Sequence, residues 1–115
     1  MSYGNYSEVY LAIEMQSYNK QENIIVKIGE TINSRQRSHS LERDKNVTIV
    51  RWCEVGGTKA YRMWIEGCLR LYIEDNFNCY RIGTDTFVFR KREEAEEIIT
   101  LFDILVGKIM SSKMF

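Results

Sequence analysis

The chain of 115 residues is 44% hydrophobic and 28% charged, which excludes a disordered polymer and suffices for a single domain, residues 1–115, with one core. Its 16 basic residues balance its 16 acidic residues, so an affinity for nucleic acid would have to come from a local basic patch. No apolar run approaches the roughly 18 residues of a membrane span, and the polar N-terminus lacks a signal-peptide core, so we expect a cytoplasmic protein that contacts no membrane.

Two β-strands are predicted in the first third of the chain. Residues 8–14 alternate in part between apolar and polar side chains, a pattern typical of a half-buried strand. Residues 24–29 form a second apolar run, and the polar segment 16–23 between the two runs predicts a hairpin with a long loop. A helix then follows over residues 31–41, with Thr31 or Asn33 as its N-cap.

The remaining elements alternate between strands and helices. Residues 47–55 are rich in β-branched side chains and predict a third strand, which the pair Gly56-Gly57 ends. Helical spacing of apolar residues begins at Thr58, a short strand covers residues 86–89, and a long amphipathic helix covers residues 92–110. This order predicts an α/β (α+β) fold in which a small, three-stranded, mostly antiparallel sheet is flanked by helices.

The three cysteines are Cys53, Cys68 and Cys79. Their number is odd and they form no Cys-x-x-Cys pair, which argues against a disulfide framework and against a zinc site. We therefore expect reduced, mostly buried thiols.

A basic segment follows the second predicted strand. Lys27-Ile28-Gly29 ends an apolar run, and the next helix carries Arg35, Arg37 and His39 without any acidic residue before Leu41. A helix N-terminus offers free N–H groups and a favourable dipole to an anion. Lys27, Arg35, Arg37 and His39 are therefore the candidate nucleic-acid-binding residues.

Four positions in this order resemble the signatures of the GIY-YIG nuclease superfamily. Tyr10 would be the tyrosine of the first strand, and Lys27-Ile28-Gly29 would be the motif of the second strand. Arg37, eight positions after Gly29, would be the arginine of the first helix, and Glu66 would be the glutamate of the next helix. The resemblance extends over residues 9–99 and lies in the order and spacing of short motifs.

The end of the chain is similar to one branch of that superfamily. Thr84-Asp85-Thr86-Phe87, followed by Glu93-Glu94-Ala95, looks like the closing strand and final helix of a branch that carries KIG in place of YIG. That branch is found largely in phage and related genomes and is often described as a DNA-binding domain. The resemblance thus implies a phage- or mobile-element-derived protein whose partner is DNA.

The resemblance also implies a metal-dependent DNA endonuclease with Tyr10, Lys27, Arg37 and Glu66 as its catalytic residues. Glu66 would hold Mg²⁺ or Mn²⁺, because such ions prefer oxygen ligands. Arg37 would bind the phosphate and Tyr10 would orient the attacking water. Lys27 replaces the second tyrosine of the family; a charged ammonium group accepts no proton, but it can bind phosphate as a point charge.

Two further functions stay open at this point. The same scaffold with weak catalysis could serve as a DNA-binding module, or as a protein-interaction module such as an inhibitor. A nuclease with one site per chain could also act as a homodimer, since it must otherwise cut the two DNA strands in turn.

Each candidate residue also has a purely structural interpretation. Tyr10 is a common packing residue of strands, and Gly29 is suited to a tight turn between strand and helix. Glu66 lies four residues from both Arg62 and Arg70, a spacing that predicts a series of surface ion pairs on one helix.

Overall fold

The computed structural model describes residues 7–112, except for the side chains of Ser34, Asp44 and Lys45. The strands in this range are β1 (Glu8–Glu14), β2 (Glu22–Thr31), β3 (Val47–Glu54), β4 (Cys79–Ile82) and β5 (Thr86–Lys91). The helices are α1 (Met15–Lys20), α2 (Ser34–Lys45), α3 (Lys59–Asn76) and α4 (Arg92–Ser111).

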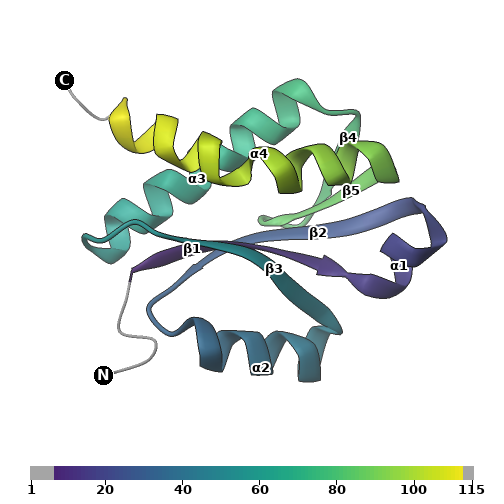
Figure 1. Cartoon of the computed structure of the whole chain (residues 1–115), viewed down its shortest axis with the longest axis horizontal. Helices are drawn as coiled ribbons and strands as arrows, with labels where there is room; N and C mark the ends of the chain where they lie inside the picture. Colours follow the sequence, from purple (N-terminus) through teal and green to yellow (C-terminus); the bar gives the residue numbers. More distant parts are fainter. Residues whose placement is uncertain (1–6, 113–115) are drawn as a thin grey trace.

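All five strands belong to one antiparallel sheet with the order β3-β1-β2-β5-β4. Helices α3 and α4 cover one face of the sheet and α2 covers the other (Figure 1). The class is therefore α+β, as predicted. The predicted count of three strands is wrong, because β4 and β5 extend the sheet beyond β2.

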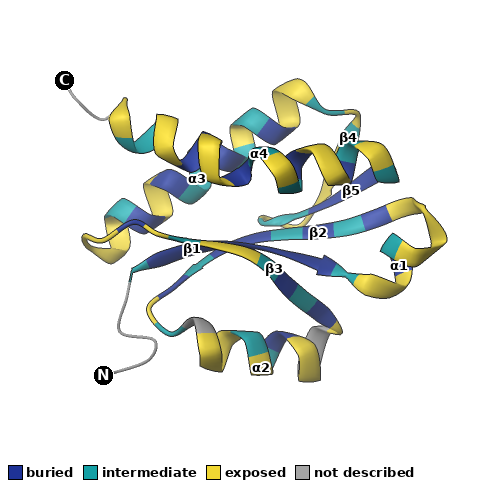
Figure 2. Cartoon of the chain, viewed as in Figure 1, coloured by how far each residue is buried: buried dark blue, intermediate teal, exposed yellow. Residues whose placement is uncertain are grey.

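Strand β1 is buried on both faces, and its side chains alternate between two apolar clusters. Val9, Leu11 and Ile13 point toward α3 and α4, where they meet residues of β2, β5 and both helices. Tyr10 and Ala12 point to the opposite face. Figure 2 shows that the strands are largely buried while the outer faces of the helices are exposed. Because both faces are covered, β1 is apolar at nearly every position.

The smaller of the two clusters lies under α2. Tyr10 and Ala12 of β1 pack there with Leu41 of α2 and with Val47 and Ile49 of β3. Helix α2 thus buries one apolar side chain, Leu41, and is otherwise mostly polar and exposed. Its basic residues are consequently presented to solvent beside the sheet.

One element between β1 and β2 differs from the sequence prediction. The predicted long loop contains the short helix α1, which Glu14 caps by accepting a hydrogen bond from the Ser17 backbone N–H at 3.2 Å. The helix ends at Gln21, whose φ of 64° lies in the left-handed region. Such a helix is too short and too polar to contain an apolar repeat that would predict it. A six-residue helix is also unstable in isolation, so it forms only within the folded chain.

Two further differences concern the ends of strands and helices. Strand β2 continues to Thr31, so Gly29 lies inside the strand and does not form the turn that the sequence suggested. Helix α2 begins after Asn33, which is its N-cap, and not at Thr31. Strand β4 was not predicted, because its residues are largely exposed and lack an apolar repeat.

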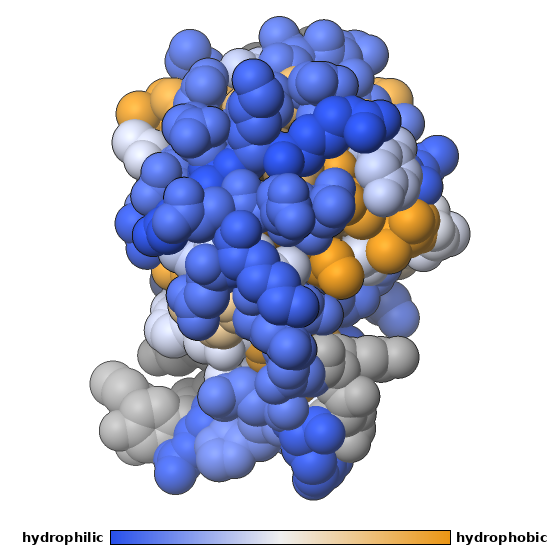
Figure 3. Space-filling view, turned by 90° about the vertical axis from the view of Figure 1, so that its right-hand side faces the viewer, coloured by the Kyte–Doolittle hydropathy of each residue, from blue (hydrophilic) through white to orange (hydrophobic). Residues whose placement is uncertain are grey.

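Two further sequence predictions concern membrane contact and the burial of the cysteines. None of the helices in residues 7–112 is long and apolar enough to cross a membrane. On the face drawn in Figure 3, hydrophilic side chains predominate and the hydrophobic ones gather mainly on one side. Cys53, Cys68 and Cys79 are free thiols, as predicted, but they are half-buried and not fully enclosed. Burial and the neighbouring Asp103 raise the pKa of Cys53 to about 11.

Candidate functional site

Tyr10 lies at the centre of the candidate site, on the face of the sheet that α2 covers. Strand β1 places it directly opposite Gly29 of β2. The phenol ring extends over this glycine, because a Cβ atom at position 29 would lie 2.3 Å from both Cζ and Oη of Tyr10. The missing side chain of Gly29 therefore creates the space in which the Tyr10 hydroxyl group lies.

Charged side chains from four other parts of the chain act on this hydroxyl group. Burial, together with the charges of Asp85, Glu66 and Glu30, raises the pKa of Tyr10 to about 12 against the opposing effect of Arg37. The protein thus keeps Tyr10 protonated at neutral pH, so its hydroxyl group can donate a hydrogen bond but does not act as a base.

Arg37 lies in the second turn of α2, close to the end of β2. The helix start is fixed by Asn33, whose side chain accepts a hydrogen bond from the Gln36 backbone N–H at 2.9 Å. The Asn33 backbone N–H in turn donates to Thr31 Oγ1 at 3.0 Å. A hollow of about 450 Å³ opens here, lined by Thr31, Ile32, Asn33, Gln36, Arg37 and Ser40.

The guanidinium group of Arg37 is well placed for an anion. The residue is exposed, and within the described part of the chain its side chain makes neither a hydrogen bond nor an ion pair. Arg35 and His39 are exposed on the same helix. An unpaired guanidinium group beside a helix N-terminus suits a phosphate oxygen.

Lys27 is already paired. Its Nζ lies 2.5 Å from Oδ2 of Asp85, and its side chain is only partly exposed. Asp85 is fixed at both ends, since its backbone carbonyl accepts from the Ile28 N–H at 3.0 Å and Oδ1 accepts from Thr86 Oγ1 at 3.0 Å. A phosphate at Lys27 would have to share the ammonium group with this carboxylate.

The ion pair with Lys27 also determines the protonation state of Asp85. Burial opposes ionisation of this carboxyl group, but the hydrogen bond and the charge of Lys27 outweigh burial and lower its pKa. Asp85 is therefore an ionised carboxylate at neutral pH, within electrostatic range of both Tyr10 and Glu66.

Glu66 is half-buried on α3. It accepts a hydrogen bond from Arg70 Nη1 at 2.7 Å. Burial raises the pKa of Glu66, Arg70 lowers it, and the nearby carboxylates of Glu30 and Asp85 raise it again. The predicted series of ion pairs along α3 is thus half right: Arg70 binds Glu66, but Arg62 points elsewhere.

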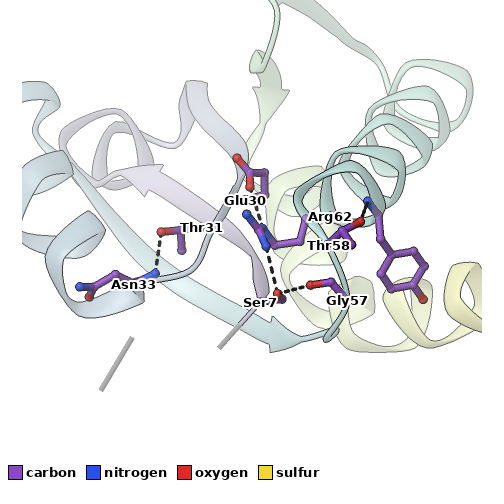
Figure 4. Close-up of polar contacts among 8 residues, drawn as sticks. Ser7, Glu30, Thr31, Asn33, Gly57, Thr58 and Arg62 are labelled. Atoms are coloured by element: carbon purple, nitrogen blue, oxygen red, sulfur yellow. Dashed lines mark hydrogen bonds and ion pairs between the residues drawn. The ribbon is translucent and has the colours of Figure 1, made fainter. Parts of the chain in front are cut away.

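Arg62 connects α3 to the end of the sheet. It is buried, with 7% of its surface exposed, and its Nε donates to Glu30 Oε1 at 2.8 Å. Its Nη1 lies 3.0 Å from the Ser7 hydroxyl group, which donates to the Gly57 carbonyl at 2.8 Å. Figure 4 shows Arg62 between Glu30 and Ser7, with Asn33 beyond the far end of the strand. This group fixes α3, and with it Glu66, relative to the segment that leads to Arg37.

The sequence did not single out two residues that lie at this site. Asp85 was noted as part of a motif and not as a member of the site. Trp52 of β3 lies opposite Tyr10 on the other neighbouring strand, and 53% of its surface is exposed. An exposed tryptophan on a strand is a weak signal, because its exposure can be known only from the fold.

The carboxylates of the site suit a weakly held divalent ion. Among residues 7–112, no group of three or more His, Cys, Asp and Glu side chains is arranged to hold a metal. Mg²⁺, however, is commonly bound by one or two carboxylates together with water and phosphate oxygens. Glu66 and Asp85 fit this pattern, although each also has a basic partner.

Comparison of the chain with protein-family models, with curated proteins and with solved structures finds no match. The function must therefore be argued from the site itself.

Proposed function

We propose that this protein binds DNA through its phosphates and hydrolyses phosphodiester bonds with the help of a divalent metal ion. One observation carries the proposal: the charges of Arg37 on α2 and of Glu66 on α3 both act on the hydroxyl group of Tyr10 on β1. A buried hydroxyl group, an unpaired guanidinium group and a carboxylate at one place are the donors and acceptors that phosphoryl chemistry uses.

The side chains divide the work according to their charge. Arg37 binds a phosphate oxygen and stabilises the negative charge that develops there in the transition state. Tyr10, which stays protonated, positions a water molecule or a phosphate oxygen by hydrogen bonding. Glu66 supplies the carboxylate for Mg²⁺ or Mn²⁺, which when bound would polarise the phosphate and lower the pKa of water.

Other residues extend the DNA contact. Arg35 and His39 lie on the same exposed helix as Arg37 and would follow the backbone. Trp52 offers an exposed indole ring on the same face of the sheet as Tyr10, and a nucleobase can stack on such a ring. Lys27 would contribute through its pair with Asp85, which keeps the local charge close to neutral.

A second candidate function is DNA binding without turnover. The ion pairs Arg70–Glu66 and Lys27–Asp85 favour it, because they occupy the two carboxylates that a metal would need. A protein-interaction module such as an inhibitor is the remaining alternative, and it would bind no DNA. The half-buried free thiols are consistent with action in the cytoplasm, which is part of the proposal.

The decisive experiment is cleavage of duplex DNA by wild-type protein and by the variant Glu66→Gln, with Mg²⁺ or Mn²⁺ supplied. Glu66→Gln keeps the size and removes the charge, so cleavage should fall by at least about 100-fold while DNA affinity changes little. Glu97→Gln on α4, an exposed acid far along the chain, is the matched control and should cleave normally.

The outcomes separate the three functions. Cleavage that survives Glu66→Gln refutes the assignment of this residue. If the wild-type protein binds DNA but never cleaves it, the remaining function is that of a DNA-binding module. If it does not bind DNA even at low salt, the remaining function is that of a protein-interaction module.

A further inference from the structure

Helix α3 carries an apolar stripe on the side that faces away from the core. Its inner face is formed by Arg62, Ile65, Leu69 and Ile73. On the outer face, Met63, Trp64 and Leu71 have 54%, 36% and 63% of their surfaces exposed. Large apolar side chains grouped on one exposed helix face are typical of an interaction surface.

The stripe is hollowed at its centre. Gly67 lies one turn after Met63 and one turn before Leu71, so no side chain fills the space between them. A Cβ atom at position 67 would meet only Arg70 Nη2, at 3.8 Å. The hollow has a volume of about 370 Å³ and is lined by Trp64, Gly67, Cys68, Arg70, Leu71, Glu74 and Arg81.

One wall of the hollow is held in place before any partner arrives. The rings of Tyr61 and Trp64 stack with their centroids 6.0 Å apart and their planes 20° apart. A tryptophan held in this way loses little conformational freedom on binding, which favours its use as a contact residue.

We infer that the partner on this surface is a second copy of the same chain, bound through antiparallel packing of α3 on α3 around Gly67. The stripe is symmetric about this glycine, since Met63 and Leu71 each lie four residues from it. A two-fold axis at Gly67 would therefore place Met63 of one protomer against Leu71 of its partner. The glycine lets the two backbones approach closely, and the two helix dipoles oppose each other favourably.

The charges at the ends of α3 fit the same arrangement. Lys59 is exposed at the N-terminus of the helix, and Glu74 and Asp75 are exposed at its C-terminus. Antiparallel packing brings the lysine of each protomer to the partner's Asp75, whereas Glu74 already lies 3.6 Å from Arg81 of its own chain. Parallel packing would bring like charges together. Charge complementarity of this kind selects the orientation.

The dimer does not rest on nuclease chemistry, and it can be tested without DNA. We expect sedimentation equilibrium in the presence of a reductant to show a reversible dimer of the wild-type chain. Gly67→Arg fills the hollow and should weaken dimerisation at least tenfold. Gly107→Arg on α4 is the matched control, because a Cβ atom there meets nothing within 4 Å and a Cβ atom at position 67 meets only the end of one flexible side chain. Circular dichroism should show both variants folded.

Reversal of charge provides a second test that a folding defect cannot mimic. Lys59→Glu should weaken the dimer, since the change is present twice in a symmetric interface. Adding Asp75→Lys to the same chain restores opposite charges across the axis and should recover most of the affinity. A wild-type chain that stays monomeric up to about 1 mM overturns the inference. So does a dimer that Gly67→Arg leaves intact, that Gly107→Arg weakens equally, or that reductant dissociates.

Discussion

The phenol ring of Tyr10 occupies the place where Gly29 lacks a side chain. The two residues are directly opposite each other on β1 and β2, and a Cβ atom at position 29 would lie 2.3 Å from the Tyr10 hydroxyl oxygen. Gly29 does not adopt a left-handed conformation, so the backbone does not require glycine here. The requirement comes from the ring, and the sheet can bury Tyr10 only because position 29 is empty.

We expect Gly29→Ala to destabilise the protein for this reason. The added methyl group would have to displace the Tyr10 ring, at a cost of about 1–3 kcal/mol or more, measured as the free energy of unfolding in urea. Gly107→Ala, in open space on α4, should be neutral or stabilising. A Tyr10→Ala change should make Gly29→Ala harmless, and a loss that persists in the double variant would contradict the contact.

Alkaline pH should weaken the protein through Tyr10. Its pKa is about 12 in the folded state and 10.0 at its ordinary value, so the folded state favours the neutral form. This contribution is fully present below pH 10 and disappears as the pH rises toward 12, a loss of about 2.7 kcal/mol. Tyr10→Phe lacks the titrating group, so its free energy of unfolding should fall less between about pH 9 and about pH 11.5. Cys53 titrates in both proteins, so its contribution cancels in the comparison. If the free energy of unfolding fell equally in both proteins, Tyr10 would not be buried as described.

The Arg62–Glu30 pair should behave as a buried ion pair. Removing either partner leaves a charge without its counterpart, so Arg62→Met and Glu30→Gln should each be destabilising. Glu30→Gln should cost up to about 3–5 kcal/mol, because it leaves the buried Arg62 alone. The double variant should lose much less than the sum of the two single losses, because no charge is then left alone. Arg81→Met, at an exposed ion pair with Glu74, is the control and should change stability by less than about 1 kcal/mol. Additive losses in the Arg62–Glu30 cycle would mean that the two side chains act independently.

The salt dependence of DNA affinity should show whether Arg37 contacts a phosphate. Arg37→Gln removes one phosphate contact, so the slope of log affinity against log salt should become shallower by about one. Arg90→Gln provides the comparison, because Arg90 of β5 lies over the ring of Tyr80 of β4, and β4 forms the edge of the sheet opposite β3. Fluorescence anisotropy with a short duplex measures both. A shallower slope in Arg90→Gln alone would move the DNA contact to β5.

The local elements of this fold could be predicted because each has a periodic pattern of its own. Strands β1, β2 and β3 and helices α3 and α4 fall close to the predicted ranges. Strand β4 could not be predicted, since Tyr80, Arg81 and Ile82 are all exposed and their strand conformation depends on pairing with β5. The count of three failed because β4 was missed and because the short strand predicted at residues 86–89, which is β5, was not placed in the sheet beside β2.

The sequence named candidate residues for the site, but it did not identify the side chains with which most of them interact. The sequence placed Arg62, Glu66 and Arg70 on one face of a helix, and helical spacing found the Glu66–Arg70 pair. It could not show that Arg62 pairs with Glu30, or Lys27 with Asp85, because such contacts depend on how distant segments meet. The same limit hid the contact between Tyr10 and Gly29, which requires the exact register of β1 on β2.

The position of β2 in the sheet has a consequence for synthesis of the chain. One edge of β2 pairs with β1, which precedes it directly, but its other edge pairs with β5, near the end of the sequence. Until β5 leaves the ribosome, an apolar strand that contains Ile24 and Val26 keeps one edge unpaired. Such an edge can pair with another nascent chain. The slowest contact to form, because of the long intervening segment, is thus also the one that protects the chain from aggregation.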